Sequence, residues 1–515
     1  MKTPARFFAR SAVRRSLHGW RVPLLVAALL VAAASPARAG NGSQEEVKRD
    51  FAKSFTLSGN QGLSLDHRFG QVTINGAPGH ELKIAATIRV QDRNAAEAQS
   101  FAEKIEIEVR EAADGVHVRT VYPDTSHFSL RIGGRTSYSV DYNISMPADA
   151  PLWLRNDFGN SEVSGVRGWS ELTNGHGSLQ VRDCGGVKMT NSFGAIELKN
   201  AAGNASITNN NGAVNVSGVK GNLEVRDRFG AIEAAQVGGS VTISGGNGEV
   251  SLSGAGGNAA INNSFGEVVA RNVNGNLLIN NSNGRIDASD VAGLAELTTS
   301  FGAIEVSRVS GALTIKNNNG ATELSDIKGF AKVTNSFGRV QGRRLLKGAE
   351  VVNGNGAVDL DAVEGDTYVK TSFGSIDVNG VKGKFTAQNS NGSVTARRIA
   401  GDAGVDTSFS GVTLEGVGGS VHVNNQNGAI EVTAAAATCH DISLRTSFSE
   451  IVARIPAAGG YRVNAKTSFG HINSDLPITA TGTLGGDSLS GTIGSGSCAL
   501  ELTNSNGNIQ ISRAP

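Results

Sequence analysis

The dipeptide Phe-Gly returns every 36 residues along the middle of this 515-residue chain. It begins at Phe193, Phe229, Phe265, Phe301, Phe337 and Phe373. Asn-Gly falls midway, at Asn211, Asn247, Asn283, Asn319, Asn355, Asn391 and Asn427, so the underlying step is 18 residues. Phe409 keeps this spacing but precedes Ser410. A period that continues without an insertion predicts a repeat architecture, which grows by adding turns to a stack.

One 18-residue period contains two short runs of alternating apolar and polar residues. In the period that begins at Phe301 they are Ile304-Glu305-Val306 and Leu313-Thr314-Ile315, with Gly311 between them. Alternation with a period of two predicts strands that bury one face. We expect glycine at the bends, such as Gly311, to supply a positive φ angle without steric cost.

Three columns of apolar residues recur at 18-residue steps. They run from Ile196 to Val394, from Ile207 to Val369 and from Val219 to Val381. Such columns require each turn to lie in register on the next, so neighbouring strands pair in parallel. The chain is therefore predicted to be all-β, a single-chain parallel β-solenoid with about 18 residues per turn in 36-residue double repeats. A 36-residue turn with four strands is the alternative, and the small core residues favour the shorter turn.

A polar column lies two residues before each Phe or Asn. We expect it to form a ladder of hydrogen bonds between asparagine side chains along the axis, which is a structural role. Its members are Asn191, Asn209, Asp227, Gly245, Asn263, Asn281, Thr299, Asn317, Asn335, Asn353, Thr371, Asn389, Thr407 and Asn425.

The N-terminus has the parts of an export signal. Basic residues precede an apolar run from Leu24 to Ala34, and Ala37-Arg38-Ala39 fits an A-x-A cleavage site. Residues 1–39 are therefore predicted to be a signal peptide, with an uncleaved membrane anchor as the alternative. Export would place the protein in the periplasm, at the cell surface or outside the cell.

Cleavage changes the charge of the chain. The segment 1–39 carries seven Lys and Arg and no acid, so 40 basic and 46 acidic residues remain, a net charge of −6. A negative chain argues against nucleic acid as the partner. The mature chain also shows no transmembrane stretch, so the expected partner is a protein or glycan surface.

The two ends lack the strict period. Residues 40–157 are predicted to be a β-rich N-terminal cap with one short helix, because Ala98, Phe101, Ala102 and Ile105 have helical spacing. Residues 158–432 are the solenoid repeats, and residues 433–515 are irregular turns with a C-terminal cap. Caps are expected because an open terminal turn is an unpaired sheet edge.

The chain contains three cysteines, Cys184, Cys439 and Cys498. Export permits disulfides, and a bond between Cys439 and Cys498 could link the C-terminal region. Cys184 would then be unpaired. The alternative is three small buried apolar residues.

The repeat units N-G-x-[VI]-x-[VLA] and S-F-G-x-[IV] resemble a bacterial family of exported β-strand-repeat proteins. So do the segments from Leu63 to Ile74 and from Tyr142 to Pro147, and the close from Thr467 to Ile509. That family is a domain of unknown function whose members are described as candidate adhesins, related to the head domain of autotransporter adhesins. The resemblance covers nearly all of the mature chain, and it implies the fold and no residue-level site.

No catalytic residue, metal site or cofactor is predicted. His176, His422, His440 and His471 stand in no recognisable triad context, and the run Asp359, Asp361, Glu364 and Asp366 does not have the spacing of a calcium loop. An outward column places Asp287, Glu305 and Glu323 on successive turns, where like charges cost stability unless bases or a cation offset them. Carboxylates on such a face are typical of a carbohydrate-active β-helix enzyme. The alternative is that these residues only make the outer face of the solenoid polar.

The six Phe-Gly phenylalanines are the remaining candidate for function. Asn replaces Phe in alternate turns, which suits a corner or an outward position. Exposed rings about every 10 Å would form a stripe able to hold a partner. The alternative is that each ring folds over the corner and seals the core. The sequence thus favours an exported, non-enzymatic protein with an adhesin-like or scaffolding role at the bacterial envelope, with an enzyme or a periplasmic partner-binding factor as alternatives.

Overall fold

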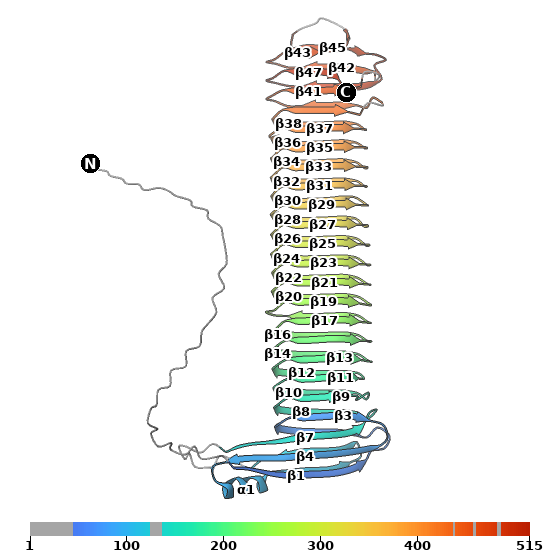
Figure 1. The fold of residues 1–515 in the computed structure, drawn as a ribbon. Coiled ribbons are helices and arrows are strands. Elements are labelled where there is room, and N and C mark those ends of the chain that lie inside the picture. Colours follow the sequence, from blue (N-terminus) through green and yellow to red (C-terminus); the bar gives the residue numbers. More distant parts are fainter. Residues whose placement is uncertain (1–44, 124–135, 436–437, 457–459, 481–485) are drawn as a thin grey trace, which may run out of the picture. The chain divides into compact units, whose positions relative to one another are not determined.

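A computed structural model describes residues 45–123, 136–435, 438–456, 460–480 and 486–515. These residues form a parallel β-solenoid of about 17 turns with about 18 residues per turn, seen in Figure 1 as coils stacked one on the next. The predicted fold class is confirmed. The predicted signal segment, residues 1–39, lies outside the described residues.

Each turn consists of two strands and two bends. In a central turn, β24 (Ala295–Phe301) leads through the Phe-Gly bend to β25 (Ile304–Val309), and a second bend leads to β26 (Leu313–Asn319). β24 pairs in parallel with β26, and Leu297 faces Ile315, 18 residues later. This register confirms the 18-residue turn and excludes the four-strand turn of 36 residues.

Two sheets run along the axis, one on each side of the core. Sheet B holds, in spatial order, β5 (Glu106–Ala112), β6 (Gly115–Val121), β2 (Gly62–Phe69), β8 (Leu152–Phe158), β10 (Ser170–His176), β12 (Val187–Phe193), β14 (Ala205–Asn211), β16 (Leu223–Phe229), β18 (Val241–Gly245), β20 (Ala259–Phe265), β22 (Leu277–Asn283), β24, β26, β28 (Ala331–Phe337), β30 (Ala349–Asn355), β32 (Thr367–Phe373), β34 (Phe385–Asn391), β36 (Ala403–Phe409), β38 (Val421–Asn427), β40 (Ile442–Arg445), β46 (Cys498–Thr503), β42 (Tyr461–Lys466), β45 (Ser488–Ile493) and β44 (Thr479–Ala480). Sheet A holds β1 (Glu45–Thr56), β4 (Glu81–Asp92), β7 (Ser137–Pro147), β3 (Val72–Ala77), β9 (Ser161–Ser164), β11 (Leu179–Cys184), β13 (Ile196–Ala201), β15 (Val214–Val219), β17 (Ile232–Val237), β19 (Val250–Ala255), β21 (Val268–Val273), β23 (Ile286–Val291), β25, β27 (Thr322–Ile327), β29 (Val340–Leu345), β31 (Val358–Val363), β33 (Ile376–Val381), β35 (Val394–Ile399), β37 (Val412–Val417), β39 (Ile430–Ala434), β41 (Ile451–Ile455), β47 (Ile509–Arg513) and β43 (Ile472–Ser474).

The core lies between the two sheets and is made of the predicted apolar columns. Val214, Ile207 and Val219, one from each column, are buried, as are their equivalents on the other turns. β-Branched side chains dominate because they pack well on a pleated surface. Each turn buries too little apolar area to fold alone, so the stack is held by burial shared between neighbouring turns.

The buried polar column links the turns differently from the prediction. Asn209 is buried, and its Nδ2 donates to the carbonyl of Gly212 at 2.7 Å in its own turn and to that of Gly194 at 3.3 Å in the turn before. The partners are therefore glycine carbonyls and not neighbouring asparagine side chains. The reason is that the Phe-Gly and Asn-Gly bends turn their carbonyls inward, where they need a donor.

Side chains and backbone do form an axial ladder at the opposite bend. Oδ1 of Asn204 accepts from the backbone N–H of Asn222 at 2.8 Å, and Oδ1 of Asn222 accepts from that of Ser240 at 2.9 Å. The same contact joins Asp366 to Lys384. These bonds tie each turn to the next at the edge where the outer bend leaves backbone groups free.

Glycine is required at position 311 because the backbone of the previous turn lies close to it, and not because of its φ angle. A Cβ at this position would lie 2.5 Å from the carbonyl oxygen of Gly293 in the turn before. The left-handed residue of the bend comes three positions earlier, at Arg308 with φ 56° and at Asp290 with φ 59°. The expectation of a positive φ at Gly311 is therefore wrong, because the chain reverses at the end of the sheet A strand.

Both ends of the solenoid carry turns that are out of chain order. At the first end β2 and β3 lie between β6 and β7 on one side and β8 and β9 on the other. The antiparallel strands β1, β4 and β5 continue the sheets beyond them, and α1 (Ala95–Lys104) packs on β1 and β4. Figure 1 shows these elements together at one end of the stack. Antiparallel strands and a helix cover the edge that a parallel stack leaves open.

At the second end the last strands of the chain turn back into the stack. β46 lies between β40 and β42, and β47 lies between β41 and β43. The antiparallel strands β45 and β44 then close sheet B. This insertion explains why the period of the sequence loosens after Asn427.

Candidate functional site

The phenylalanines of the repeat lie on the outside of one edge of the solenoid. Eight of them end a sheet B strand, at the bend that leads to sheet A, whereas Phe448 and Phe469 follow β40 and β42 and form isolated bridges. Within the described residues this edge carries ten exposed phenylalanines, and we call it the phenylalanine edge: Phe158, Phe193, Phe229, Phe265, Phe301, Phe337, Phe373, Phe409, Phe448 and Phe469. These residues are 41% to 75% exposed. The interpretation that the rings seal the core is therefore wrong.

Local geometry turns each ring outward. The residue two positions before it, such as Asn191 before Phe193, points inward and is buried. At most of these positions the residue after the ring has a left-handed φ, as at Gly194 with 126° and Gly302 with 143°, a conformation that glycine adopts without steric cost. The buried amide closes the core, and the ring is left free.

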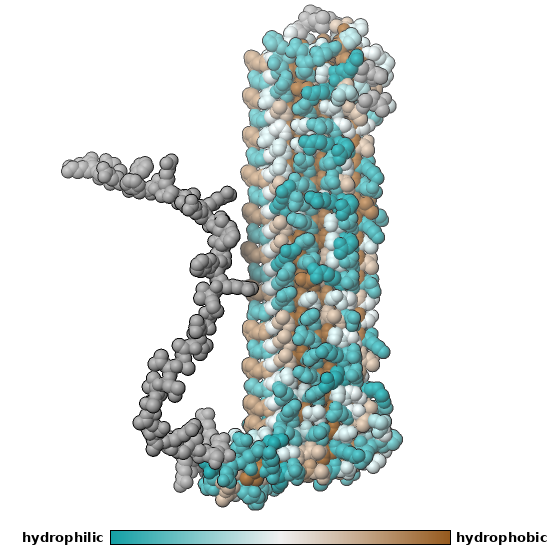
Figure 2. All heavy atoms as spheres, viewed as in Figure 1, coloured by the Kyte–Doolittle hydropathy of each residue, from teal (hydrophilic) through white to brown (hydrophobic). Residues whose placement is uncertain are grey.

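Asparagine separates the rings in the stack. Asn211 faces Phe193 on one side and Phe229 on the other, and Asn319 faces Phe301 and Phe337 in the same way. Neighbouring turns lie about 4.8 Å apart, so the rings recur about every 10 Å. Figure 2 shows this edge as a row in which apolar and polar side chains alternate.

Four members of the edge fall outside the six residues that the Phe-Gly dipeptide singled out. Phe409 and Phe448 precede serine, whereas Phe158 and Phe469 precede glycine but stand outside the unbroken 36-residue run. The shared signal is an outward phenylalanine two residues after an inward Asn or Thr. A search for that pattern would have found all four.

The first end of the edge is a continuous stack of rings. Phe69, Phe158, His176 and Phe193 follow one another on four successive turns. Their ring centroids are 5.3, 4.5 and 4.9 Å apart, with interplanar angles of 18°, 8° and 11°. His176, which the sequence leaves without a role, occupies here the position that asparagine has elsewhere.

Two of the three outward acids that suggested an enzyme are paired with arginine. Asp287 contacts Arg271 at 2.5 Å, and Glu305 contacts Arg285. Next to them, the Arg308 guanidinium beside Asp290, 2.6 Å away, holds the pKa of that carboxyl below its usual value. Such pairs remove the like-charge cost across turns. Glu305 and Glu323 nevertheless line one hollow on this face, together with Gln341 and Arg343.

Each of the four acids between residues 359 and 366 also has a bonding partner of its own. Asp359 contacts Arg339, Asp361 accepts from Asn379, Glu364 contacts Lys382 and Asp366 accepts from the backbone of Lys384. Within the described residues no three His, Cys, Asp or Glu are grouped so that they could hold a metal ion.

The surface is hollowed where Gly404 replaces an outward side chain of sheet B. Asp402, Asp406, His422, Asp441 and Glu501 line this hollow. Asp402 accepts from the backbone N–H of Ser420 at 2.8 Å, and Asp441 accepts from that of Ala499 at 2.8 Å. Two of its carboxylates thus hold the bends, which is a structural role.

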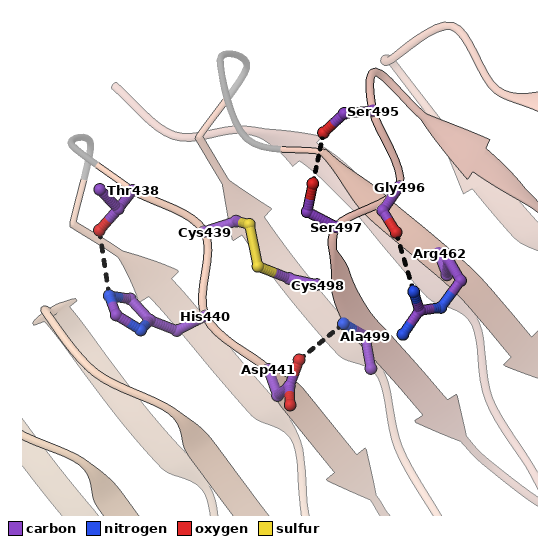
Figure 3. The surroundings of a disulfide bond; sticks show 10 residues. All are labelled: Thr438, Cys439, His440, Asp441, Arg462, Ser495, Gly496, Ser497, Cys498 and Ala499. Carbon is purple, nitrogen blue, oxygen red and sulfur yellow. Dashed lines mark hydrogen bonds between the residues drawn. A yellow bond between two sulfur atoms is a disulfide. The ribbon is translucent and has the colours of Figure 1, made fainter.

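Cys439 and Cys498 are joined by a disulfide, with their Cα atoms 6.0 Å apart. Figure 3 shows the bond linking the segment before β40 to the start of β46, beside the contact of Asp441 with Ala499. The disulfide therefore holds the inserted strand in place. Cys184 is a free thiol, and burial raises its pKa to about 11, so it is a poor nucleophile.

None of the helices in the described part of the chain is long and apolar enough to cross a membrane.

Comparisons with known proteins point to a family of unknown function. The comparison with curated proteins gives no match. Among solved structures, one match is a "putative cell adhesion protein" from Clostridium sporogenes ATCC 15579, at 9% identity over 91% of this chain and all of that chain. Its TM-score of 0.16 means that it carries no argument about fold or function.

The family model of Toastrack DUF4097 matches residues 341–512. This segment includes the late solenoid turns, the inserted strands and the disulfide, so the family resemblance expected from the repeat units is confirmed there. Residues 341–512 are therefore similar to the Toastrack family, a domain of unknown function.

Proposed function

We propose that this protein is an exported, non-enzymatic β-solenoid that acts as an adhesin-like or scaffolding protein at the bacterial envelope. The observation that carries this proposal is the phenylalanine edge, where ten half-exposed rings follow one line along the solenoid. Exposed aromatic rings in a regular row are costly in water, and they mark surfaces that bind a protein or a glycan. The arginine pairs of Asp287 and Glu305 favour a structural role for these two acids over a catalytic one.

Replacing Phe265, Phe301 and Phe337 together with serine tests the binding surface. We expect the thermal midpoint to stay within a few degrees, because the rings lie outside the core and the buried amides remain. Binding of the mature chain to washed cells and to envelope fragments, measured by cosedimentation, should fall at least about tenfold.

Phe330→Ser is the matched control, because Phe330 is 41% exposed but lies at the opposite bend. This variant should bind as the unchanged protein does. A collapse of the thermal midpoint in the triple variant would show instead that the rings are structural. Binding of the triple variant equal to that of the unchanged protein would show that the phenylalanine edge is not the binding surface.

Cell fractionation combined with surface proteolysis tests the location. The mature chain should appear in the periplasm, at the surface or in the medium, without residues 1–39. Intact protein in the cytoplasm would contradict the proposal.

A further inference from the structure

We propose that the phenylalanine edge is self-complementary, and that two copies of this chain pair along it in antiparallel orientation. In this pairing the rings of each copy enter the asparagine positions of the other. The inference rests on the proposed function of this edge as a binding surface, and it names the partner as a second copy.

Along the edge, phenylalanine rings alternate with asparagine positions, which we call gaps. Rings about 10 Å apart are separated by one turn with a shorter side chain. Small residues flank the rings, such as Ser300 before Phe301 and Gly302 after it. A ring that enters from outside at the level of Asn319 would lie about 5 Å from the rings of Phe301 and Phe337, which is a normal stacking distance.

The chain itself fills one such position with a ring. His176 replaces asparagine between Phe158 and Phe193, and it stacks on them at 4.5 and 4.9 Å. An aromatic ring at this level is therefore compatible with the rings on both sides. The pairing we propose repeats this arrangement along the edge with rings from a second molecule.

At the second end of the solenoid, phenylalanine and asparagine alternate along the edge although they do not alternate along the sequence. Along the sequence Phe448 and Phe469 follow each other, and Asn506 comes last. In the structure Asn506 lies between them, because β46 is inserted between β40 and β42. Simple copying of a repeat does not explain this placement. A requirement that rings and gaps alternate along the edge does.

Symmetry selects the antiparallel orientation. A two-fold axis parallel to the solenoid brings equal turns to the same level, so ring would meet ring. A two-fold axis perpendicular to the solenoid reverses the order of the turns, and a register exists in which the eight rings from Phe229 to Phe469 meet the eight asparagine gaps from Asn211 to Asn506 of the other copy. The same patch then serves both copies, as in an isologous dimer.

The area is sufficient for a stable dimer. A phenylalanine side chain presents roughly 200 Å², and about half of each ring is exposed. Eight rings that enter gaps therefore offer about 800 Å² per copy, or about 1,600 Å² in the pair. A standard specific interface buries about 1,600 Å² in total.

Sedimentation velocity of the mature chain over a roughly hundredfold range of concentration tests the pairing. The unchanged protein should shift from monomer to dimer. The deciding variant is Asn283→Phe, Asn319→Phe and Asn355→Phe, which adds apolar surface but closes three gaps. We expect dimerisation to weaken by roughly tenfold for each closed gap.

Asn283→Ser, Asn319→Ser and Asn355→Ser form the matched control, which leaves the gaps open and should still dimerise. The thermal midpoint of each variant shows that it is folded. Dimerisation of the gap-filled variant as strong as that of the unchanged protein would overturn the proposal. So would an unchanged protein that stays monomeric, including one that binds cells or a glycan through its phenylalanines, and that last result would leave the proposed function standing.

Cysteine cross-linking tests the orientation. Asn211→Cys and Phe469→Cys lie near opposite ends of the edge, and they face each other in the register that fills every asparagine gap, so a mixture of the two variants should form mixed disulfide dimers. Ser310→Cys, which is exposed at the opposite bend, is the control and should not cross-link. Dimers of Asn211→Cys with itself, in place of mixed dimers, would exclude the antiparallel pairing.

Discussion

Asp227 stands in the buried polar column where the neighbouring turns have Asn209 and Gly245. An asparagine at this position donates its Nδ2 hydrogens to glycine carbonyls, which a carboxylate cannot do. The residue is 5% exposed, and burial raises the pKa of its carboxyl to about 6, while the nearby backbone amides of Arg228 and Phe229 offset only part of the rise. The folded protein therefore favours the protonated acid.

The shift predicts that Asp227→Asn stabilises the protein above pH 6. Below about pH 4 the Asp227 carboxyl is protonated in both the folded and the unfolded protein, and its contribution to the free energy of unfolding is fully present. Between pH 4 and pH 6 the unfolded chain ionises first, so stability is lost as the pH rises. The asparagine variant should regain up to about 3 kcal/mol at pH 7.5 and little at pH 3.5.

Urea unfolding of both proteins at the two pH values measures this difference. The matched control is Asp406→Asn, because Asp406 lies outward on the same sheet. It should change stability by less than about 0.5 kcal/mol at either pH. An equal gain in both variants would show that the effect is one of surface charge.

At the scale of the element, the inserted strand β46 depends on its covalent link. The Cys439–Cys498 bond joins residues 59 positions apart and closes a loop that contains the six strands β40 to β45. Without it, ordering the last strands costs the entropy of closing that loop. Chain-entropy reasoning gives about 4 kcal/mol for a loop of this length.

Cys439→Ser with Cys498→Ser should therefore loosen the end of the solenoid and leave its middle intact. Hydrogen exchange of β46 and β47 should become faster by a large factor, whereas that of β22 to β26 should not change, because each turn contacts only its neighbours. Adding reductant to the double variant is the control and should have no further effect. Unchanged exchange in β46 would mean that pairing alone holds the insertion.

At the scale of the whole molecule, the solenoid is a linear stack in which each turn contacts only the turns on either side of it. Turns add nearly independent increments of stability, and the period of 36 residues is the smallest step that keeps both register and ring alternation. Deletion of residues 301–336 removes two complete turns. We expect a folded protein whose stack is shorter by about 10 Å in small-angle scattering and whose thermal midpoint falls by only a few degrees.

Deletion of residues 301–327 is the matched control, although it removes fewer residues. It joins one sheet B strand to the next, so inward and outward positions no longer match their neighbours. This variant should be unfolded or aggregated. If the shorter deletion were better tolerated than the longer one, stability would not depend on register in the way that the stack implies.

The local pattern of the chain is sufficient for the fold of the middle. Val214 and its column equivalents repeat at 18 residues, and β-branched residues at that step allow only parallel strands in register. The same pattern placed the phenylalanines at a bend. It did not decide between a ring that covers the core and one that faces solvent, because Phe and Asn share that position.

Tertiary structure decided what depends on contacts between distant segments. The partners of the buried amides are glycine carbonyls of the previous turn, and the left-handed residue is Arg308 rather than Gly311. The exposure of the phenylalanine edge, the stack of His176 on its neighbours and the return of β46 into the stack also depend on three-dimensional packing. A repeat sequence specifies how one turn lies on the next, whereas its ends and its surface are set by which segments meet in space.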